Sequence, residues 1–397
     1  MTAAADVDWA ATRARFHLPE GVIYLDGNSL GPLPSGVPER MERVIAQWRD
    51  SLIGGWNEGW MAWPGALGDR IGALVGAPAG SVTVGDTLSI KVHQLLAAAL
   101  EMRPGRRRIL SDSGNFPTDL YMAEGLIGSL DRGHRLDLAA PEAVVDALDE
   151  DVAVLMLTHV DYRTGRMHDM AAVTEAAHAV GAVVLWDLAH SAGAVPVDLA
   201  ACAAEFACGC TYKYLNAGPG APAFAYARPD LIDRVRPALS GWLGHAAPFA
   251  FEPSYRPARG IDRLRVGTPP VLQLAALEAA LDAWEGVGME AARARSLALQ
   301  ERLIAALDGV MPLASPREAG ARGSQVSFRH PEGYAVVQAL IARGVIGDFR
   351  APDIVRFGVT PLFLSEGDVD AAAAHVRAVI EGREWDDPAF KARRAVT

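Results

Sequence analysis

The chain has 397 residues, of which 50% are hydrophobic and 21% charged, a composition typical of a soluble enzyme with two domains around a shared site. Its net charge of −11 and pI near 5.4 argue against a nucleic-acid-binding surface. Because the N-terminus lacks the features of a signal peptide and no apolar stretch is long enough to span a membrane, we expect a cytoplasmic protein without membrane or nucleic-acid partners.

The N-terminal fifty residues are expected to form an arm. The segment from Asp26 to Pro34 is dense in glycine and proline, which predicts a fixed loop, and a helix is expected at about 37–48. Four tryptophans follow within a short stretch. An aromatic substrate pocket, an oligomer interface and simple core packing would each explain them: Trp48, Trp56, Trp60 and Trp63.

Small and hydroxylated residues precede an apolar helix expected at about 90–101. A helix N-terminus offers free backbone N–H groups and the positive end of a dipole, which suits a phosphate group. Thr87, Leu88 and Ser89 are therefore candidate phosphate contacts. An ordinary helix cap without a ligand is the alternative.

From residue 107 the pattern alternates between strands and helices. Strands are expected at 108–111, 151–158 and 181–187, with helices from about 118 and over 170–180. Such alternation predicts an α/β fold with a mainly parallel sheet, whose strand ends place the site along one edge.

Two strand ends carry residues that suit pyridoxal 5'-phosphate (PLP). Asp187 closes one apolar run, and Lys213 follows another that begins at Phe206. A lysine can form a Schiff base with the PLP carbonyl, and a carboxylate can keep the pyridine ring protonated. A lysine at a strand end and a helix-capping aspartate are the ordinary explanations of each residue taken alone.

After residue 272 the chain is expected to form a small α+β domain. Helices are expected at 272–286, 289–307, 336–343 and 366–381, strands at 325–328 and 354–357, and loose order from residue 383 onward. We therefore expect an arm at 1–50, a large domain at 51–271 and a small domain at 272–397. Cys202, Cys208 and Cys210 suit small core residues in a reducing compartment, and no metal site is expected.

Four segments together resemble the kynureninase family: Phe116–Tyr121, Asp187–His190, Tyr212–Asn216 and Gly267–Pro270, within a similarity that extends from Leu25 to Arg356. The resemblance implies the PLP-dependent fold type I, with a seven-stranded, mainly parallel sheet and a homodimer with shared active sites. It also implies hydrolysis of L-kynurenine, or of a ring-substituted kynurenine, to anthranilate and L-alanine in tryptophan catabolism.

The same resemblance assigns roles to individual residues. Lys213, Tyr212 and Asp187 are implied to be catalytic, and Arg356 to bind the substrate α-carboxylate. The implied PLP contacts come from several segments of the chain: Thr87, Leu88, Ser89, Phe116, Thr118, Asp119, Thr158, Asp187, His190, Tyr212 and Lys213, with Trp242 and Thr268 reaching a neighbouring subunit.

Three residues bear on the proton transfer and on the preferred ring substituent of the substrate. Tyr212 would need help from nearby cations to act as a base at neutral pH. Thr268 stands where many kynureninases have asparagine, and Asp161 where an amide is more usual, so the preferred ring substituent stays open.

The sequence also bears on functions other than hydrolysis. Cysteine desulfuration requires a nucleophilic cysteine on a mobile loop, and no cysteine follows Cys210. Transamination and a PLP-binding protein without turnover remain alternatives. A nucleotide-binding dehydrogenase is disfavoured because no strand is followed by Gly-x-Gly-x-x-Gly.

Overall fold

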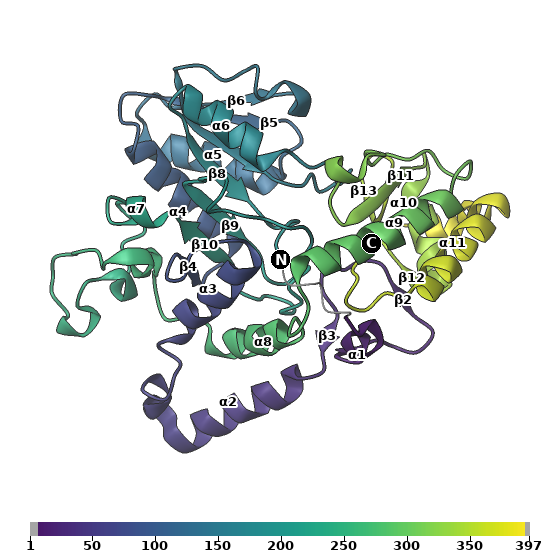
Figure 1. Ribbon diagram of the computed structural model, residues 1–397, viewed down its shortest axis with the longest axis horizontal. Helices are drawn as coiled ribbons and strands as arrows, with labels where there is room; N and C mark the ends of the chain where they lie inside the picture. Colours follow the sequence, from purple (N-terminus) through teal and green to yellow (C-terminus); the bar gives the residue numbers. More distant parts are fainter. Residues whose placement is uncertain (1–6, 394–397) are drawn as a thin grey trace.

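The computed structural model of the chain describes residues 7–393. A large α/β part, with the blue and teal elements, lies beside a smaller green and yellow part at the right of Figure 1. No helix between residues 7 and 393 combines the length and apolar character that a bilayer crossing requires.

Seven strands form the central sheet in the order β4-β10-β9-β8-β7-β5-β6. Their bounds, in that order, are Val82–Val84, Phe224–Ala227, Phe206–Gly209, Val183–Asp187, Val152–Thr158, Arg108–Asp112 and Arg135–Ala139. Strands β6, β5, β7, β8 and β9 run parallel, while β10 is antiparallel to both β9 and β4. The expectation of a seven-stranded, mainly parallel sheet is confirmed.

Helices cover both faces of this sheet because side chains alternate along buried strands. Val154 and Leu185 join the apolar cluster under α4 and α5, whereas Leu155 and Trp186 join the cluster that includes α3, α6 and α8. These helices have the following bounds: α3 Trp63–Leu74, α4 Leu88–Glu101, α5 Pro117–Leu130, α6 Met170–Ala179 and α8 Val271–Asp282.

The smaller part is built on a three-stranded antiparallel sheet in the order β11-β14-β13. Its main elements are β11 Gln325–Arg329, β13 Asp348–Arg350, β14 Ile354–Gly358, α9 Met289–Ala306, α10 Gly333–Ala342 and α11 Glu366–Glu381. A capping box between Ser365 and Asp368 starts α11 at the residue where the sequence predicts it.

The expectation of loose order after residue 383 is wrong for most of that segment. A 3₁₀ helix, Glu384–Asp386, and helix α12, Pro388–Lys391, are present. Trp385 anchors them, because its ring packs edge-on against His330 with centroids 5.0 Å apart. Residues 394–397 lie outside the described part of the chain.

The N-terminal arm connects the two parts. It contains α1 Trp9–Arg13, β1 Phe16–His17, β2 Ile23–Tyr24, β3 Leu33–Pro34 and α2 Val37–Ser51. Strand β2 pairs in parallel with β12, Val345–Ile346, of the smaller part, while α2 packs against α8 beneath the large sheet (Figure 1). We propose the domain division 1–50, 51–271 and 272–397, with α8 as the helix that the small domain shares with the large one.

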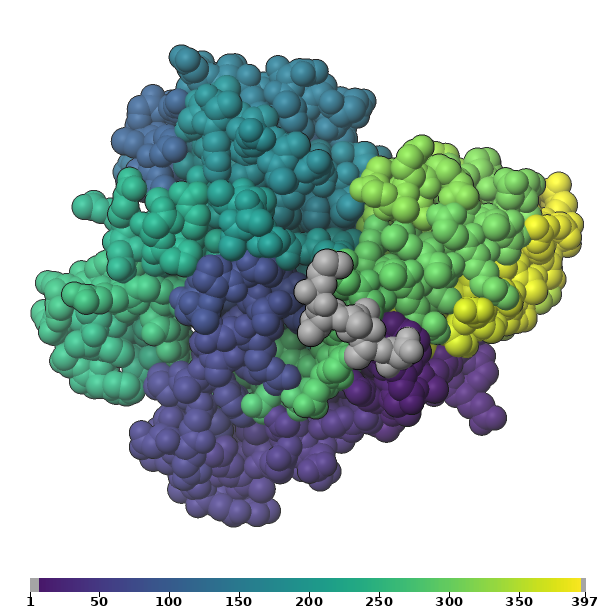
Figure 2. All heavy atoms as spheres, viewed as in Figure 1, coloured from purple at the N-terminus to yellow at the C-terminus, as the bar shows by residue number. Residues whose placement is uncertain are grey.

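Two lobes stand out from the large part in Figure 2. One contains α2 and the 3₁₀ helix Leu52–Trp56, and the other contains the segment after α7, Pro229–Ile232. The tryptophans of the first lobe differ in burial, which separates the explanations that the sequence left open. Trp60 is buried in a small apolar cluster and Trp56 packs against its ring, whereas Trp48 is 58% exposed.

Candidate active site

The register of the parallel strands brings the predicted polar residues to one edge of the sheet. Thr158, at the end of β7, lies opposite Asp187 at the end of β8, and Asp187 lies opposite Cys208 in β9. Lys213 follows β9 by four residues. Carboxyl ends of parallel strands form the usual ligand-binding edge of an open α/β sheet, and these residues meet there.

Lys213 sits in a turn that is packed from both sides. Asn216 adopts a left-handed conformation, with φ at 59°, and its backbone N–H donates to the carbonyl of Lys213. On the other side, the N–H of Gly31 in the arm donates to the carbonyl of Tyr212 at 2.7 Å. A Cβ atom at Gly31 would lie 2.6 Å from the Lys213 carbonyl oxygen, so the arm approaches this closely only as glycine.

The Lys213 amine points at a neutral imidazole. Its Nζ lies 2.9 Å from Nε2 of His190 and 5.9 Å from the ring centroids of both Phe116 and Tyr212. Burial, followed by the charge of Lys213 and of Arg356, holds the pKa of His190 well below its ordinary value. His190 is therefore neutral at physiological pH, and its Nε2 accepts a hydrogen bond from Lys213.

Two buried carboxyl groups face the same lysine. Asp187 accepts from the backbone N–H of Ala189 at 2.8 Å, and the hydroxyl of Thr158 lies 3.4 Å from its second oxygen. Burial raises the pKa of Asp187, although Lys213 opposes the rise. Burial also raises the pKa of Asp119, and the charge of Asp187 adds to that effect.

These carboxyl groups fit the pyridine end of PLP. Asp119 is 2% exposed, and its Oδ2 has no hydrogen-bond partner among the described residues. An orphaned buried acceptor is costly, and a protonated ring nitrogen would supply the missing donor. Because both carboxyl groups also interact with Lys213, the residues present can hold a cationic aromatic ring next to an amine.

Asn115 belongs to this cluster, although the sequence did not predict it as a site residue. Its Oδ1 accepts from the hydroxyl of Thr158 and from the backbone N–H of Phe116, the latter at 2.7 Å. Its Nδ2 donates to Ser111 at 2.9 Å. Asn115 thus fixes Thr158 and the chain entry into α5, where Phe116 is the N-terminal cap residue. Its place between a strand end and a helix start was the signal available in the sequence.

The expected phosphate contacts lie at the N-terminus of α4. Thr87 is the extended cap residue of this helix, and no side chain caps its first N–H groups, which leaves them available. Thr87 is exposed, while Leu88 and Ser89 are half-buried. On the other side of the site, Thr118 is half-buried in the first turn of α5. That both groups contact PLP stays a prediction.

The environment of Tyr212 differs from the one expected of a base. The neighbouring Cys210 is the main cause that raises the pKa of Tyr212 far above its ordinary value, with burial and Asp187 acting in the same direction. Tyr212 is therefore a neutral phenol at physiological pH. It can donate a proton, but the groups around it do not help it to remove one.

Arg356 is held in a fixed orientation at the border with the small part. The register of β13 and β14 places Asp348 directly opposite it, and Arg356 Nε donates to Asp348 Oδ1 at 2.6 Å while Nη2 donates to Oδ2. Arg356 also donates to the carbonyl of Tyr162 and to the hydroxyl of Ser29, the latter at 2.9 Å. Asp348, Ser29 and the carbonyl of Tyr162 together take four of the five N–H groups of Arg356, so a carboxylate would bind the remaining Nη1–H and replace Ser29 or that carbonyl at a second one.

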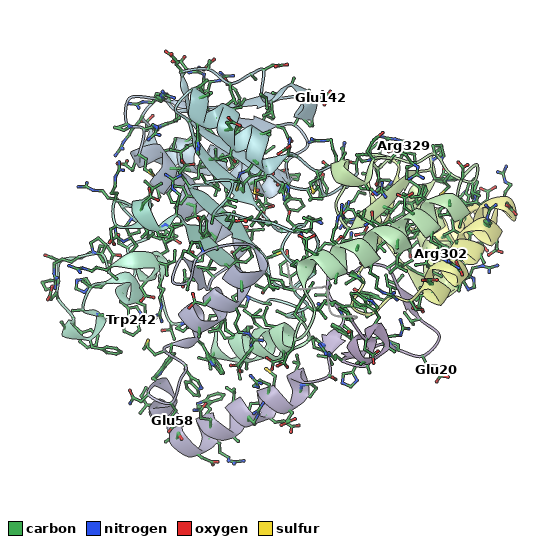
Figure 3. The ribbon with its side chains drawn as sticks, in the orientation of Figure 1. Glu20, Glu58, Glu142, Trp242, Arg302 and Arg329 are labelled. Carbon is green, nitrogen blue, oxygen red and sulfur yellow. The ribbon has the colours of Figure 1, made fainter. Side chains whose placement is uncertain are left out.

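Trp242 and Thr268 are separated from this cluster. Both line a hollow with Ile53, Trp56 and Phe249, and no residue of the Lys213 cluster lines it. Figure 3 shows Trp242 on the lobe at the left edge, next to the lobe that carries Glu58. Within one subunit, the structure does not bring these two predicted PLP contacts to Lys213.

The carboxylate of Asp161 accepts hydrogen bonds from its own turn. Its Oδ1 accepts from the backbone N–H of Arg163 at 3.1 Å and from the hydroxyl of Thr164 at 2.7 Å, so it closes a local turn. The cysteines Cys202, Cys208 and Cys210 are all free, and residues 7–393 contain no cluster of histidine, cysteine and acidic side chains that suits a metal ion.

Comparisons with known proteins agree along nearly the whole chain. The family model described as kynureninase C-terminal domain matches residues 292–376. The kynureninase of Pseudomonas fluorescens is 49% identical over 400 residues, which cover 98% of this chain and 96% of that one. The kynureninase of Burkholderia pseudomallei strain 1106a gives the same identity and coverage.

Solved structures share the fold at low sequence identity. A cysteine desulfurase from Thermococcus onnurineus NA1 has a TM-score of 0.81 and 19% identity, with 94% of this chain and 98% of that one covered. A structure of C-DES with glycine covalently linked to its PLP cofactor has a TM-score of 0.80 and 19% identity, with 92% and 98% covered. These likenesses identify the fold as that of PLP-dependent fold-type I enzymes.

Proposed function

Because the chain belongs to the kynureninase family, we propose that it uses PLP to hydrolyse L-kynurenine, or a ring-substituted kynurenine, to anthranilate and L-alanine. The structural observation that carries the proposal is the pair of buried carboxyl groups that face Lys213, Asp187 at the end of β8 and Asp119 in the first turn of α5. We propose that the protein acts in the cytoplasm, in tryptophan catabolism that supplies NAD biosynthesis.

PLP, when bound, supplies an electron sink for the negative charge that develops at the substrate Cα. Asp187 and Asp119 would hold the protonated ring nitrogen, while Phe116 would lie against the ring and His190 beside it. The hydroxyl of Thr158 supports Asp187 at 3.4 Å. The free N–H groups at the start of α4, with Thr87, Leu88, Ser89 and Thr118 as further contacts, would bind the phosphate side.

Lys213 would hold the cofactor and then move a proton through its Nζ. Once displaced by the substrate amine, this Nζ can take the Cα proton, and the neutral His190, 2.9 Å away, stabilises the ammonium that results. Water adds to the ketone carbon of the substrate, and the Cβ–Cγ bond breaks to release anthranilate. Tyr212, which its raised pKa keeps as a neutral phenol, would donate its proton to Cβ of the alanine that remains. Arg356 would bind the α-carboxylate and so orient Cα toward Lys213.

Desulfuration is the alternative that the solved structures suggest, since several are cysteine desulfurases. It requires an accessible thiolate. Cys208 and Cys210 are buried, and burial raises the pKa of both thiols. Cys202 is half-buried and precedes β9 in the sequence, whereas Lys213 follows it. Burial raises the pKa of the Cys202 thiol too. These thiols do not suit persulfide chemistry.

The direct test is turnover by the PLP-loaded protein. With L-kynurenine we expect anthranilate, followed by its fluorescence, and an equal amount of L-alanine, measured enzymatically. Cysteine and a 2-oxo acid with alanine serve as control substrates for desulfuration and transamination, and neither should be consumed at a comparable rate. If neither kynurenine nor its 3-hydroxy or other ring-substituted forms are cleaved although PLP is bound, the proposed hydrolysis is wrong.

We also propose a homodimer in which Trp242 and Thr268 reach the active site of the partner. Large apolar side chains are exposed on the two lobes that border the hollow containing these residues: Trp48, Leu52, Ile53, Phe249 and Phe251. Ile53 is 78% exposed, and an apolar surface of this kind is typical of a subunit interface.

Substitution of Ile53 by Glu is expected to weaken the dimer and the activity together, since a charge would be buried in the interface. Sedimentation velocity measures the first effect and anthranilate fluorescence the second. Leu138→Glu is the matched control, because Leu138 is also exposed but lies on β6, away from both lobes. A wild-type protein that sediments as a fully active monomer would contradict the proposed dimer.

A further inference from the structure

A second group of charged residues lies where the N-terminal arm meets β13 and β14. Arg356 and Arg350 both bind Asp348, and the Arg350 Nη2–Asp348 Oδ2 distance is 2.8 Å. Ser29 of the arm donates to Asp348 at 2.6 Å and accepts from Arg356 at 2.9 Å. Asp26 stands in the same turn of the arm as Ser29, and it interacts with both Asp348 and Arg356.

The two carboxyl groups of this cluster are in different situations. Both oxygens of Asp348 are occupied by donors from Arg356, Arg350 and Ser29. Oδ1 of Asp26 is buried and has no hydrogen-bond partner in the described part of the chain. Two carboxylates in one buried site repel each other, so the one with fewer donors takes up a proton first.

The charges of the cluster then decide whether it can bind an anion. Arg350 and Arg356 carry two positive charges, and Asp26 and Asp348 carry two negative charges when both are ionised. In that state nothing is left to compensate a substrate carboxylate. With a proton on Asp26, one positive charge remains, which matches one carboxylate.

The pKa values of Asp26 and Asp348 agree with a cluster in which Asp26 alone takes up a proton. Burial, and then the charge of Asp348, raise the pKa of Asp26 to about 7, although Arg356 opposes the rise. Burial acts in the same direction on Asp348, but Arg356, Arg350 and Ser29 together outweigh it and hold the pKa of Asp348 at about 2. Asp348 thus stays ionised at neutral pH, while Asp26 changes its charge there.

The other titratable groups around Asp26 do not change their protonation state near neutral pH. Tyr24, on the same arm, has a raised pKa because of burial and then Asp26, and Tyr214, after β9, has a raised pKa because of burial. The pKa of His190, which senses both arginines, is lowered by burial, so this ring stays neutral. Among the described residues, the titratable and charged groups that interact with Asp26 from the arm, the β9 turn and β13–β14 are Tyr24, Tyr214, Asp348, Arg350 and Arg356.

We propose that Asp26 is a specificity-determining residue that is protonated when the substrate carboxylate binds, which leaves one positive charge of Arg350 and Arg356 free for that carboxylate. The proposal rests on the proposed function, because it takes Arg356 as the carboxylate-binding residue. Above neutral pH, Asp26 accepts a proton from solvent as the ligand binds. No other group has to change its protonation state, and no bond other than this O–H is formed.

The first test separates binding from turnover by their pH dependence. In the wild-type enzyme, KM for L-kynurenine should rise by up to about tenfold per pH unit above roughly pH 7, because the ionised form of Asp26 predominates there. The substrate amine titrates as well, so the quantity of interest is the ratio of the wild-type KM to the KM of Asp26→Asn at each pH. The asparagine variant cannot ionise at this position, and its KM should lack this part of the rise, while the two kcat profiles stay parallel.

The second test needs no turnover. A kynurenine analogue without the α-amino group, 4-(2-aminophenyl)-4-oxobutanoate, is titrated into the PLP-loaded enzyme by calorimetry in two buffers of different ionisation enthalpy at about pH 8. The wild-type enzyme should take up close to one proton per carboxylate bound, and Asp26→Asn close to none. Asp353→Asn, which removes a surface carboxylate that pairs with Arg329 at 2.9 Å, should behave as the wild type.

The outcomes are distinguishable. Absence of anthranilate formation contradicts the proposed function and leaves the calorimetric result to be judged by itself. Anthranilate formation with no proton uptake by the wild type overturns the role of Asp26, and so does a KM profile that is unchanged in a folded Asp26→Asn. If Asp26→Asn does not fold, the wild-type calorimetry alone decides, since it requires no variant.

Discussion

Replacement of Lys213 by Ala is expected to lower kcat for L-kynurenine by about 10²- to 10⁴-fold, because the variant has no amine to take the Cα proton. Within residues 7–393, the one hydrogen-bond partner of the Lys213 side chain is His190, at 2.9 Å, so removal of this side chain should leave the surrounding fold intact. Anthranilate fluorescence measures the rate. Borohydride reduction followed by mass spectrometry should attach PLP to the wild type and not to the variant.

The chain offers unusually clear controls for this experiment, because it contains three lysines, Lys91, Lys213 and Lys391. Lys391 lies in α12 and binds Asp386 at 2.6 Å, so Lys391→Ala should keep full activity and PLP labelling. Lys91 is buried and paired with Asp86 at 3.0 Å, which leaves it poorly placed to react with PLP. A reduced PLP adduct on either of these lysines would show that the cofactor site is assigned to the wrong residue.

Arg356→Lys is the substitution with the second largest expected effect. Lysine keeps the charge but has three N–H donors in place of five, so it cannot hold both Asp348 and a substrate carboxylate as Arg356 can. The loss of one charge-assisted hydrogen bond corresponds to about 1.5–3 kcal/mol, so kcat/KM should fall by roughly 10- to 150-fold, mainly through KM. Steady-state kinetics with L-kynurenine, together with thermal unfolding to verify the fold, give the result.

Arg329→Lys is the matched control, because Arg329 lies in the neighbouring strand β11 and pairs with Asp353 at the surface. It should have wild-type kinetics. Unchanged KM in Arg356→Lys would mean that another group binds the α-carboxylate, and the charge argument for Asp26 would then lose its basis. A fall in kcat at constant KM would instead indicate that Arg356 orients the substrate only in the transition state.

Most of the large domain could be predicted from hydrophobic periodicity. The buried runs that end at Thr158 and Asp187 became β7 and β8, and the helix between them, α6, starts at the expected residue, Met170. Strands β4, β6 and β10 were missed, and β4 and β10, with three and four residues, are too short for a period that separates a strand from a loop. Their antiparallel pairing is a property of the sheet, not of either segment.

The C-terminal segment and the lobes illustrate the same limit. Trp385 orders the residues after α11 through contact with His330, which is 55 positions away in the chain. In the same way, sequence alone left three uses open for the tryptophans between residues 48 and 63. Packing assigned Trp60 to a core cluster and left Trp48 on the surface.

For the site, the sequence by itself determined which chemistry is available: a lysine and an aspartate at neighbouring strand ends, with an arginine near the end of the chain. Because the carboxyl ends of parallel strands lie along one edge of the sheet, these positions could be anticipated. Only the tertiary structure decided the charge state of the groups around them. The pKa of Asp26 depends on Asp348, which lies 322 positions away, and that of Tyr212 on its interactions with Cys210 and Asp187 and on its own burial. Burial and charge interactions arise from distant segments that meet in space, and no local pattern records them.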